Sequence, residues 1–177
     1  MNLTRDNNIL SYFKRVRSKT LNLVMKLNHE DMVVQSEDFV SPIKWHLGHT
    51  TWFFETFILK KFNKKYKTFD KSFNYIFNSY YNKIGLYNPK SKRGLLVRPT
   101  TKKIFEYREF VNNEILNLLI KNVDNNKVLN LIELGINHEQ QHQELILMDI
   151  LNIFYNCPFQ PPYKKRQKIR DIKRSKF

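Results

Sequence analysis

Two short stretches of the chain hold four of its five histidines. His138 and His142 lie four residues apart, a spacing that stacks two imidazoles one turn apart on one face of an α-helix. His46 and His49 lie in a second stretch, which is rich in aromatic residues. An imidazole from this second stretch would complete a half-open metal site, because three neutral imidazoles are a common ligand set for divalent metals.

The hydrophobic pattern predicts that these histidines point into the protein. On a helical wheel, His138 and His142 share a face with residues of which only the last is charged: Leu131, Leu134, Gly135, Leu145 and Asp149. His49 lies on the aromatic face of its own helix, with His46 at the edge of that face. Buried imidazoles need partners for both ring nitrogens, and a shared cation would satisfy several of them at once. We therefore predict that the chain binds a metal ion.

The residue types leave the metal open. Three imidazoles with free coordination positions suit zinc, iron, copper or nickel. The usual non-heme iron triad replaces one histidine by a carboxylate, whereas an all-histidine set leaves the full +2 charge on the metal. That charge would favour a thiolate substrate as a further ligand.

Residues 138–142 also match the HExxH pattern, in which Glu139 would be the general base of a zinc protease. Such proteases need a third ligand further along the chain, and no histidine follows His142. The acids that follow lie on the same helix or, for Asp171, in a basic segment. We therefore reject the protease interpretation and expect Glu139 to lie beside the metal ligands or to face solvent.

Two glycines lie inside the expected helices. Gly48 precedes His49, and Gly135 lies one turn before His138. Glycine costs roughly 1 kcal/mol relative to alanine in a helix interior, so both positions need an explanation. A close approach of helices at the metal site and ordinary tight packing explain them equally well.

Length and composition indicate one folded domain. The chain has 177 residues, of which 41% are hydrophobic and 14% aromatic, with only four glycines and six prolines. These values favour a helical protein with its own core over a loop-rich β fold. No apolar run approaches the roughly 20 residues that a membrane helix needs, and the N-terminus does not resemble a signal peptide. Cys157 is the only cysteine, which fits the reducing cytoplasm.

The net charge of +15 raises the question of nucleic-acid binding. Residues 164–176 hold eight basic residues and one acid, and a second lysine cluster lies around residues 60–71, where we expect a loop. Much of the positive charge therefore lies in a terminal segment and an expected loop. We do not expect nucleic acid to be the main partner.

Hydrophobic spacing and capping residues predict an all-α fold. Ser41 followed by Pro42 reads as a helix N-cap and first helical residue. The expected helices span about residues 5–27, 42–61, 73–84, 101–121 and 127–155. Four of them are long, and an irregular connection over residues 62–98 separates the second long helix from the third, so we predict a four-helix bundle over residues 1–157. Residues 158–177 would form a proline-containing linker and a basic tail.

Several motifs resemble the N-terminal, DinB-like domain of the ergothioneine-biosynthesis sulfoxide synthases. They are SPxKWHLGHTTWFFET at 41–56, FNSYY at 77–81, RGLLxRPT at 93–100, YR at 107–108 and ELGxNHEQQHQEL at 133–145. Their order and spacing agree with the family from about residue 21 to residue 163. Several long motifs in register are far more specific than any one of them.

The resemblance implies a mononuclear iron(II) site formed by His49, His138 and His142, with zinc as the alternative metal. His46 and Glu139 would lie beside these ligands without binding the ion. Family members use O2 to join a thiol sulfur to the imidazole of hercynine, and the product is a sulfoxide. The thiol would be cysteine or γ-glutamylcysteine, and a selenium donor is the other candidate.

The resemblance also assigns two substrate contacts. Gln141 matches a position that contacts hercynine, and Arg93 matches a group that holds the carboxylate of the thiol substrate. Without the resemblance, Gln141 would be a helix-surface amide and Arg93 a solvated loop cation.

Family members continue into a second domain, related to formylglycine-generating enzymes, that supplies a catalytic tyrosine. Here NCPFxPPY at 156–163 resembles the linker into that domain, and the sequence ends 14 residues later. We therefore expect no catalytic residue in this chain besides the metal ligands, a separate chain as a partner, and no complete reaction by this chain alone.

Two other functions stay open. A stand-alone DinB-like bundle would be a metal-dependent thiol transferase, in which a metal-bound thiolate attacks an electrophile. A non-catalytic module would bind a metal, or nucleic acid through its basic tail.

Overall fold

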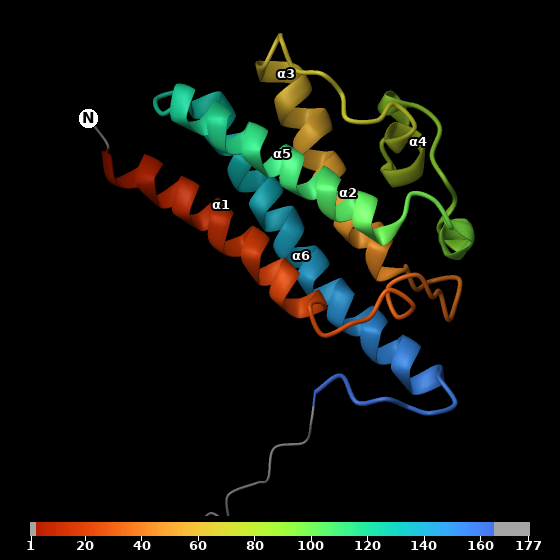
Figure 1. The fold of residues 1–177 in the computed structure, drawn as a ribbon. Helices are drawn as coiled ribbons and strands as arrows, with labels where there is room; N and C mark the ends of the chain where they lie inside the picture. Colours follow the sequence, from red (N-terminus) through yellow and green to blue (C-terminus); the bar gives the residue numbers. More distant parts are fainter. Residues whose placement is uncertain (1–2, 165–177) are drawn as a thin grey trace, which may run out of the picture.

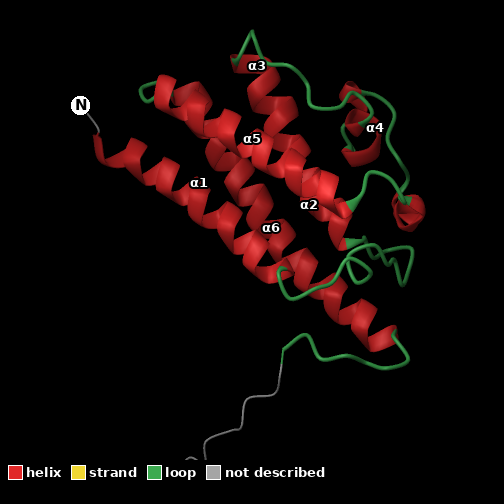
Figure 2. Ribbon diagram, viewed as in Figure 1, coloured by secondary structure: helices red, strands yellow, loops and turns green. Residues whose placement is uncertain are grey.

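Four long helices form the body of the protein in the computed structural model, which describes residues 3–164 (Figure 1). α1 (Leu3–Val24) runs beside α6 (Asn126–Asn156), and α2 (Ile43–Phe54) packs on both α5 (Thr101–Lys121) and α6. All regular structure between residues 3 and 164 is helical (Figure 2). The predicted all-α fold is confirmed.

The connection between the second and third long helices is irregular, as predicted. α2 continues through a π-helical turn, η1 (Glu55–Leu59), and ends in α3 (Lys60–Phe62), close to the predicted end at residue 61. The connection then forms three short helical segments: α4 (Phe73–Phe77), η2 (Asn82–Ile84) and η3 (Lys90–Leu95).

The prediction of a single helix over residues 73–84 is therefore wrong, because the helix is interrupted between Phe77 and Asn82. The Asn78 side chain donates hydrogen bonds to the carbonyls of Tyr81 and Gly85, at 3.3 and 3.1 Å. These bonds hold the backbone in a turn between α4 and η2, because an asparagine side chain competes well with helical hydrogen bonding.

Side-chain caps start the two helices that follow. Thr100 accepts a hydrogen bond from the Lys103 N–H at the start of α5, and Asn125 accepts from the N–H groups of Lys127 and Val128 at the start of α6. The predicted Ser41 cap of α2 is wrong. Pro42 occupies the N-cap position, and no side chain caps this helix.

The core face of α6 lies to one side of the predicted face. Ile132, Ile136 and Ile146 are fully buried, whereas Leu134 and Leu145 are 54% and 40% exposed. The helical wheel did not identify this core face, because the face also carries buried polar side chains such as Glu139. As a result, the histidines of α6 lie at the border between the core and the surface.

Both helical glycines allow helices to pack closely. A Cβ atom at Gly135 would lie 2.6 Å from the Phe54 ring of α2, and a Cβ atom at Gly48 would overlap the Phe77 ring of α4. Any larger side chain would force these segments apart. Both glycines therefore make room for an aromatic ring of a neighbouring segment, which both of the explanations considered require.

The segment after α6 turns back toward α1. The Tyr163 hydroxyl donates a hydrogen bond to the Leu23 carbonyl at 2.7 Å. The predicted basic tail lies almost entirely beyond residue 164, outside the described residues. Among the helices of residues 3–164, none has a stretch apolar and long enough to cross a bilayer.

Candidate metal centre

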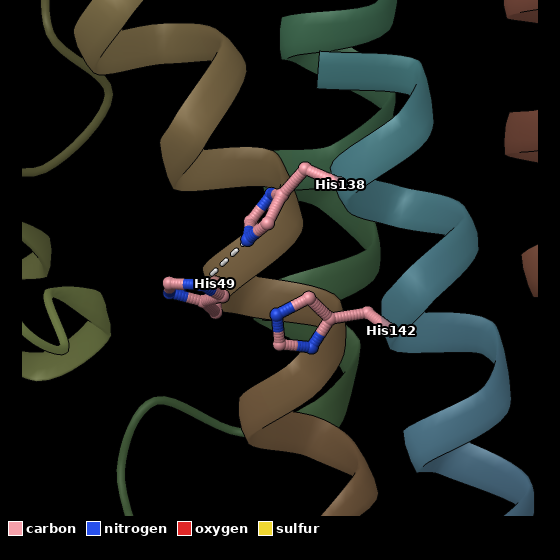
Figure 3. A group of neighbouring side chains, drawn as sticks. All are labelled: His49, His138 and His142. Carbon is pink, nitrogen blue, oxygen red and sulfur yellow. Dashed lines mark hydrogen bonds between the residues drawn. The ribbon is translucent and has the colours of Figure 1, made fainter. Parts of the chain in front are cut away.

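Three imidazoles from two helices converge at one point. His49 of α2 and His138 and His142 of α6 each bring one ring nitrogen within 4.8 Å of the other two (Figure 3). The ring centroids form a nearly equilateral triangle, with separations of 5.0, 4.7 and 4.7 Å. Within residues 3–164, no other group of three histidine, cysteine or carboxylate side chains is arranged in this way.

Hydrogen bonds at Nδ1 leave the Nε2 atoms of His49 and His142 facing the centre, whereas the buried Nδ1 of His138 has no partner among the described residues. His49 Nδ1 lies 2.6 Å from the Phe77 carbonyl, which only accepts, so its Nε2 faces His138 Nε2 at 3.2 Å. His142 Nδ1 lies 2.8 Å from His46 Nδ1, which leaves His142 Nε2 for the centre. Figure 3 shows one ring nitrogen of His142 directed toward the other two rings and the second directed away.

Burial keeps these imidazoles neutral. Burial lowers the pKa of His138 to about 4, and it lowers the pKa values of His49 and His142 well below the ordinary histidine range, with further lowering from neighbouring imidazoles. Neutral rings offer lone pairs without first losing a proton. The donor set therefore fits a divalent transition metal, and it resembles the three-histidine set of some catalytic zinc sites.

Aromatic residues of α2 fix the His49 ring. Trp45 stacks on His49 with centroids 4.6 Å apart and planes at 11°, and Trp52 lies 5.8 Å away at 22°. The Phe77 ring packs against Gly48, which brings the adjoining carbonyl within reach of His49 Nδ1. A side chain at position 48 would push this carbonyl away from the ligand.

The three histidines line one wall of a cavity of about 720 Å³. Its lining includes exposed apolar and aromatic side chains, which we call the mouth of the cavity: Phe39, Tyr80, Leu145 and Met148. Binding sites for small molecules commonly combine such apolar walls with a few polar groups. A molecule bound in this cavity would lie beside the three histidines.

The chain matches a family model described as the DinB superfamily over residues 12–146. It belongs to the DinB superfamily. A search of curated proteins finds no match. DinB domains typically bind a metal ion, and the three-histidine group is compatible with that property.

Arg93 of this DinB domain is a fixed cation in the same cavity, 4% exposed. Its Cζ lies 3.3 Å from the centroid of the Trp45 ring, and its Nη1 donates to the Ser41 hydroxyl at 2.9 Å. Burial lowers the pKa of Arg93 to about 10, which leaves it charged at neutral pH. Its Nε is buried and has no hydrogen-bond partner among the described residues.

Two further residues singled out from the sequence, Gln141 as a substrate contact and His46 as a neighbour of the ligands, line the same cavity. Gln141 is exposed and lines the cavity. His46 is 2% exposed and also lines the cavity, but its ring nitrogens bond to His142 and Asp149 rather than facing the centre of the triad. Sequence reasoning did not identify Asp149 as the partner of His46, because a wheel shows shared faces but no contacts.

Glu139 is fully buried, so one of the two alternatives expected for it, that it faces solvent, is wrong. Its carboxylate accepts a hydrogen bond from Arg17 at 2.8 Å, another from Thr20 at 2.6 Å, and forms an ion pair with Arg108. Burial raises the pKa of Glu139, but the charges of Arg108 and Arg17 outweigh it and hold that pKa at about 2. The carboxylate therefore points into the bundle, away from any role as a general base.

We predict that Glu139→Gln lowers the free energy of unfolding by roughly 3–5 kcal/mol at pH 7, because two buried guanidinium groups lose their counter-charge. The folded-state pKa lies below the unfolded-state value, so this contribution is complete above about pH 5 and is lost as the pH falls toward 2. Urea denaturation at several pH values would measure the difference from wild type, which should narrow in acid. Glu144→Gln, at an exposed position of the same helix, should change stability by less than about 0.5 kcal/mol. A small, pH-independent effect of Glu139→Gln would contradict this account.

Proposed function

We propose that this DinB domain is the iron(II)-binding part of an ergothioneine-type sulfoxide synthase. The observation that carries the proposal is that three neutral imidazoles and one buried arginine line the same cavity. A divalent metal held by neutral ligands retains its full charge, and it would attract a thiolate. Arg93, a cation in the lining of the same cavity, would attract a carboxylate on the same molecule. Amino-acid thiols such as cysteine and γ-glutamylcysteine carry both groups.

The proposed reaction balances with one molecule of O2. A carbon–sulfur bond replaces the S–H bond of the thiol and a C–H bond of the hercynine imidazole. The sulfur gains one oxygen atom, and the second oxygen atom leaves as water. An iron(II) ion bound by His49, His138 and His142 would supply the redox chemistry.

The residues of the chain would bind and orient the two substrates. Arg93 would hold the thiol carboxylate, and its stacking on Trp45 fixes the direction of the guanidinium. Gln141, on the rim of the cavity, would contact hercynine. We propose that a further domain or a separate chain covers the apolar mouth and contributes a tyrosine, and that the protein acts in the cytoplasm, where thiols stay reduced.

A second candidate is a metal-dependent thiol transferase, with zinc as the metal. Membership of the DinB superfamily and the open three-histidine site favour it, because neither feature requires O2. Metal binding would activate the thiolate for attack on an electrophile. The two candidates share the thiol site and differ in the second substrate.

We predict that Arg93→Met weakens cysteine binding to the cobalt(II)-loaded protein by about 10–100-fold, because a charge-assisted hydrogen bond to a carboxylate contributes about 1.5–3 kcal/mol. The thiolate-to-cobalt absorption band would measure the dissociation constant. Cysteamine, which lacks the carboxylate, serves as the matched control and should bind both proteins within about threefold. Equal binding of cysteine and cysteamine to the wild type would argue against a carboxylate site at Arg93.

We predict that the iron(II)-loaded protein, supplied with the domain that covers the cavity, forms a hercynine–cysteine sulfoxide only when O2 is present. Mass spectrometry after incubation with ¹⁸O2 should show one labelled oxygen atom in the product. The transferase predicts a different outcome: conjugation of cysteine to an added electrophile without O2, equally with zinc. That outcome, together with no oxygenated product, would reject the synthase proposal.

A further inference from the structure

A hydrogen-bonded series of three side chains leads from the protein surface to one of the metal ligands. The Asp149 carboxylate lies 2.8 Å from His46 Nε2, and His46 Nδ1 lies 2.8 Å from His142 Nδ1. Asp149 and His142 both belong to α6, seven residues apart, and the His46 ring of α2 lies between them. The described residues contain no comparable series at His49, whose Nδ1 bonds to a backbone carbonyl instead.

The chemistry of these groups fixes the direction of each hydrogen bond. An ionised carboxylate only accepts, so His46 Nε2 donates to Asp149. A neutral imidazole carries one proton, so His46 Nδ1 has to accept from His142 Nδ1. His142 is then protonated at Nδ1, and its lone pair at Nε2 faces His49 and His138. The series therefore selects the ring nitrogen of His142 that the metal site needs.

Asp149 is itself held in place. The carboxylate oxygen that bonds to His46 also accepts a hydrogen bond from the Ser41 N–H, at 3.0 Å. The Ser41 hydroxyl accepts from Arg93, at 2.9 Å. The backbone that anchors the series thus also positions the arginine of the cavity, and Ser41 contributes to both instead of capping α2.

We propose that His46 and Asp149 are positioning residues of the metal site, which hold His142 in the tautomer and orientation that bind the ion. The inference rests on metal binding by His49, His138 and His142, as proposed above. Hydrogen-bond partners of metal-ligating imidazoles orient the ring and raise its basicity, and their loss typically weakens metal binding by 10–100-fold. Helix α2 then has two roles at the site: it supplies one ligand, and it orients a ligand of the neighbouring helix.

Cobalt(II) affinity, measured by competition with a chelator, tests the proposal. We expect His46→Leu to weaken cobalt binding by about 10–100-fold, because His142 Nδ1 loses its acceptor. His46→Asn should recover most of this loss, since its side-chain oxygen can replace Nδ1 as acceptor. Asp149→Asn should weaken binding less than His46→Leu does. His29→Leu removes an exposed histidine and should leave the affinity unchanged.

The double variant His46→Leu/Asp149→Asn separates positioning from general damage to the fold. If Asp149 acts only through His46, the double variant should bind cobalt as weakly as His46→Leu alone. In ¹⁵N spectra of the cobalt-free or zinc-loaded protein, His142 should carry its proton on Nδ1 in wild type, and this preference should disappear in His46→Leu.

The outcomes distinguish this inference from the metal site itself. If wild type binds no cobalt, or if His49→Ala binds it as tightly as wild type, the metal site and the inference both fail. If the ligand variants lose cobalt while Asp149→Asn and both His46 variants keep wild-type affinity, the inference alone fails. If His46→Leu does not fold, His46→Asn and Asp149→Asn decide the question. A loss of cobalt affinity in Asp149→Asn alone supports the hydrogen-bonded series. Wild-type cobalt affinity in both variants overturns it.

Discussion

The structure depends on one buried carboxylate and the two arginines that neutralise it. A carboxylate in the core has to be paired, because an unpaired charge there is very costly. Glu139 of α6 bonds to Arg17 of α1 and Arg108 of α5. The same two guanidinium groups donate to hydroxyl groups of α2, at Thr51 and Thr50, so the network joins all four long helices. Glu139 adjoins His138 in the chain, and Thr50 adjoins His49. The pairing that fixes the helices in register therefore also fixes the two ligand-bearing turns.

This network supports the turns that carry the three imidazoles, although one of the rings lies near the surface. His138 is only half-buried, and the apolar mouth of the cavity is open. Each of two rings is held by neighbouring groups. Trp45 stacks on His49, and the Phe77 carbonyl lies within hydrogen-bond distance of His49 Nδ1. His46, which is bonded to Asp149, lies within hydrogen-bond distance of His142 Nδ1. A site built in this way holds its ligands in place while it leaves one side free for substrates.

Residue spacing predicted much of the fold and the histidine cluster. The four long helices and the long connection follow from hydrophobic periodicity, because each long helix buries one face. Spacing placed His138 and His142 on one helix face and predicted a third imidazole from the stretch that holds His46 and His49, and the family resemblance assigned that role to His49. Predictions from hydrophobic spacing were wrong at positions where a polar residue is part of the core. A helical wheel treats Glu139 as a surface residue because it is charged. Its partners Arg17 and Arg108 lie 122 and 31 residues away in the sequence, and a wheel of one helix does not show them. Ser41 was misassigned for the same reason, since its partners Arg93 and Asp149 are remote in the chain.

The central claim is that His49, His138 and His142 bind one metal ion through three imidazole nitrogens. X-ray absorption at the iron edge of anaerobically loaded protein tests it most directly, together with the metal content of the His49→Ala, His138→Ala and His142→Ala variants. The account predicts three imidazole nitrogens at roughly 2.0–2.2 Å in the wild type and loss of metal in each variant. Full metal occupancy in all three variants would contradict it, as would a spectrum without imidazole scattering.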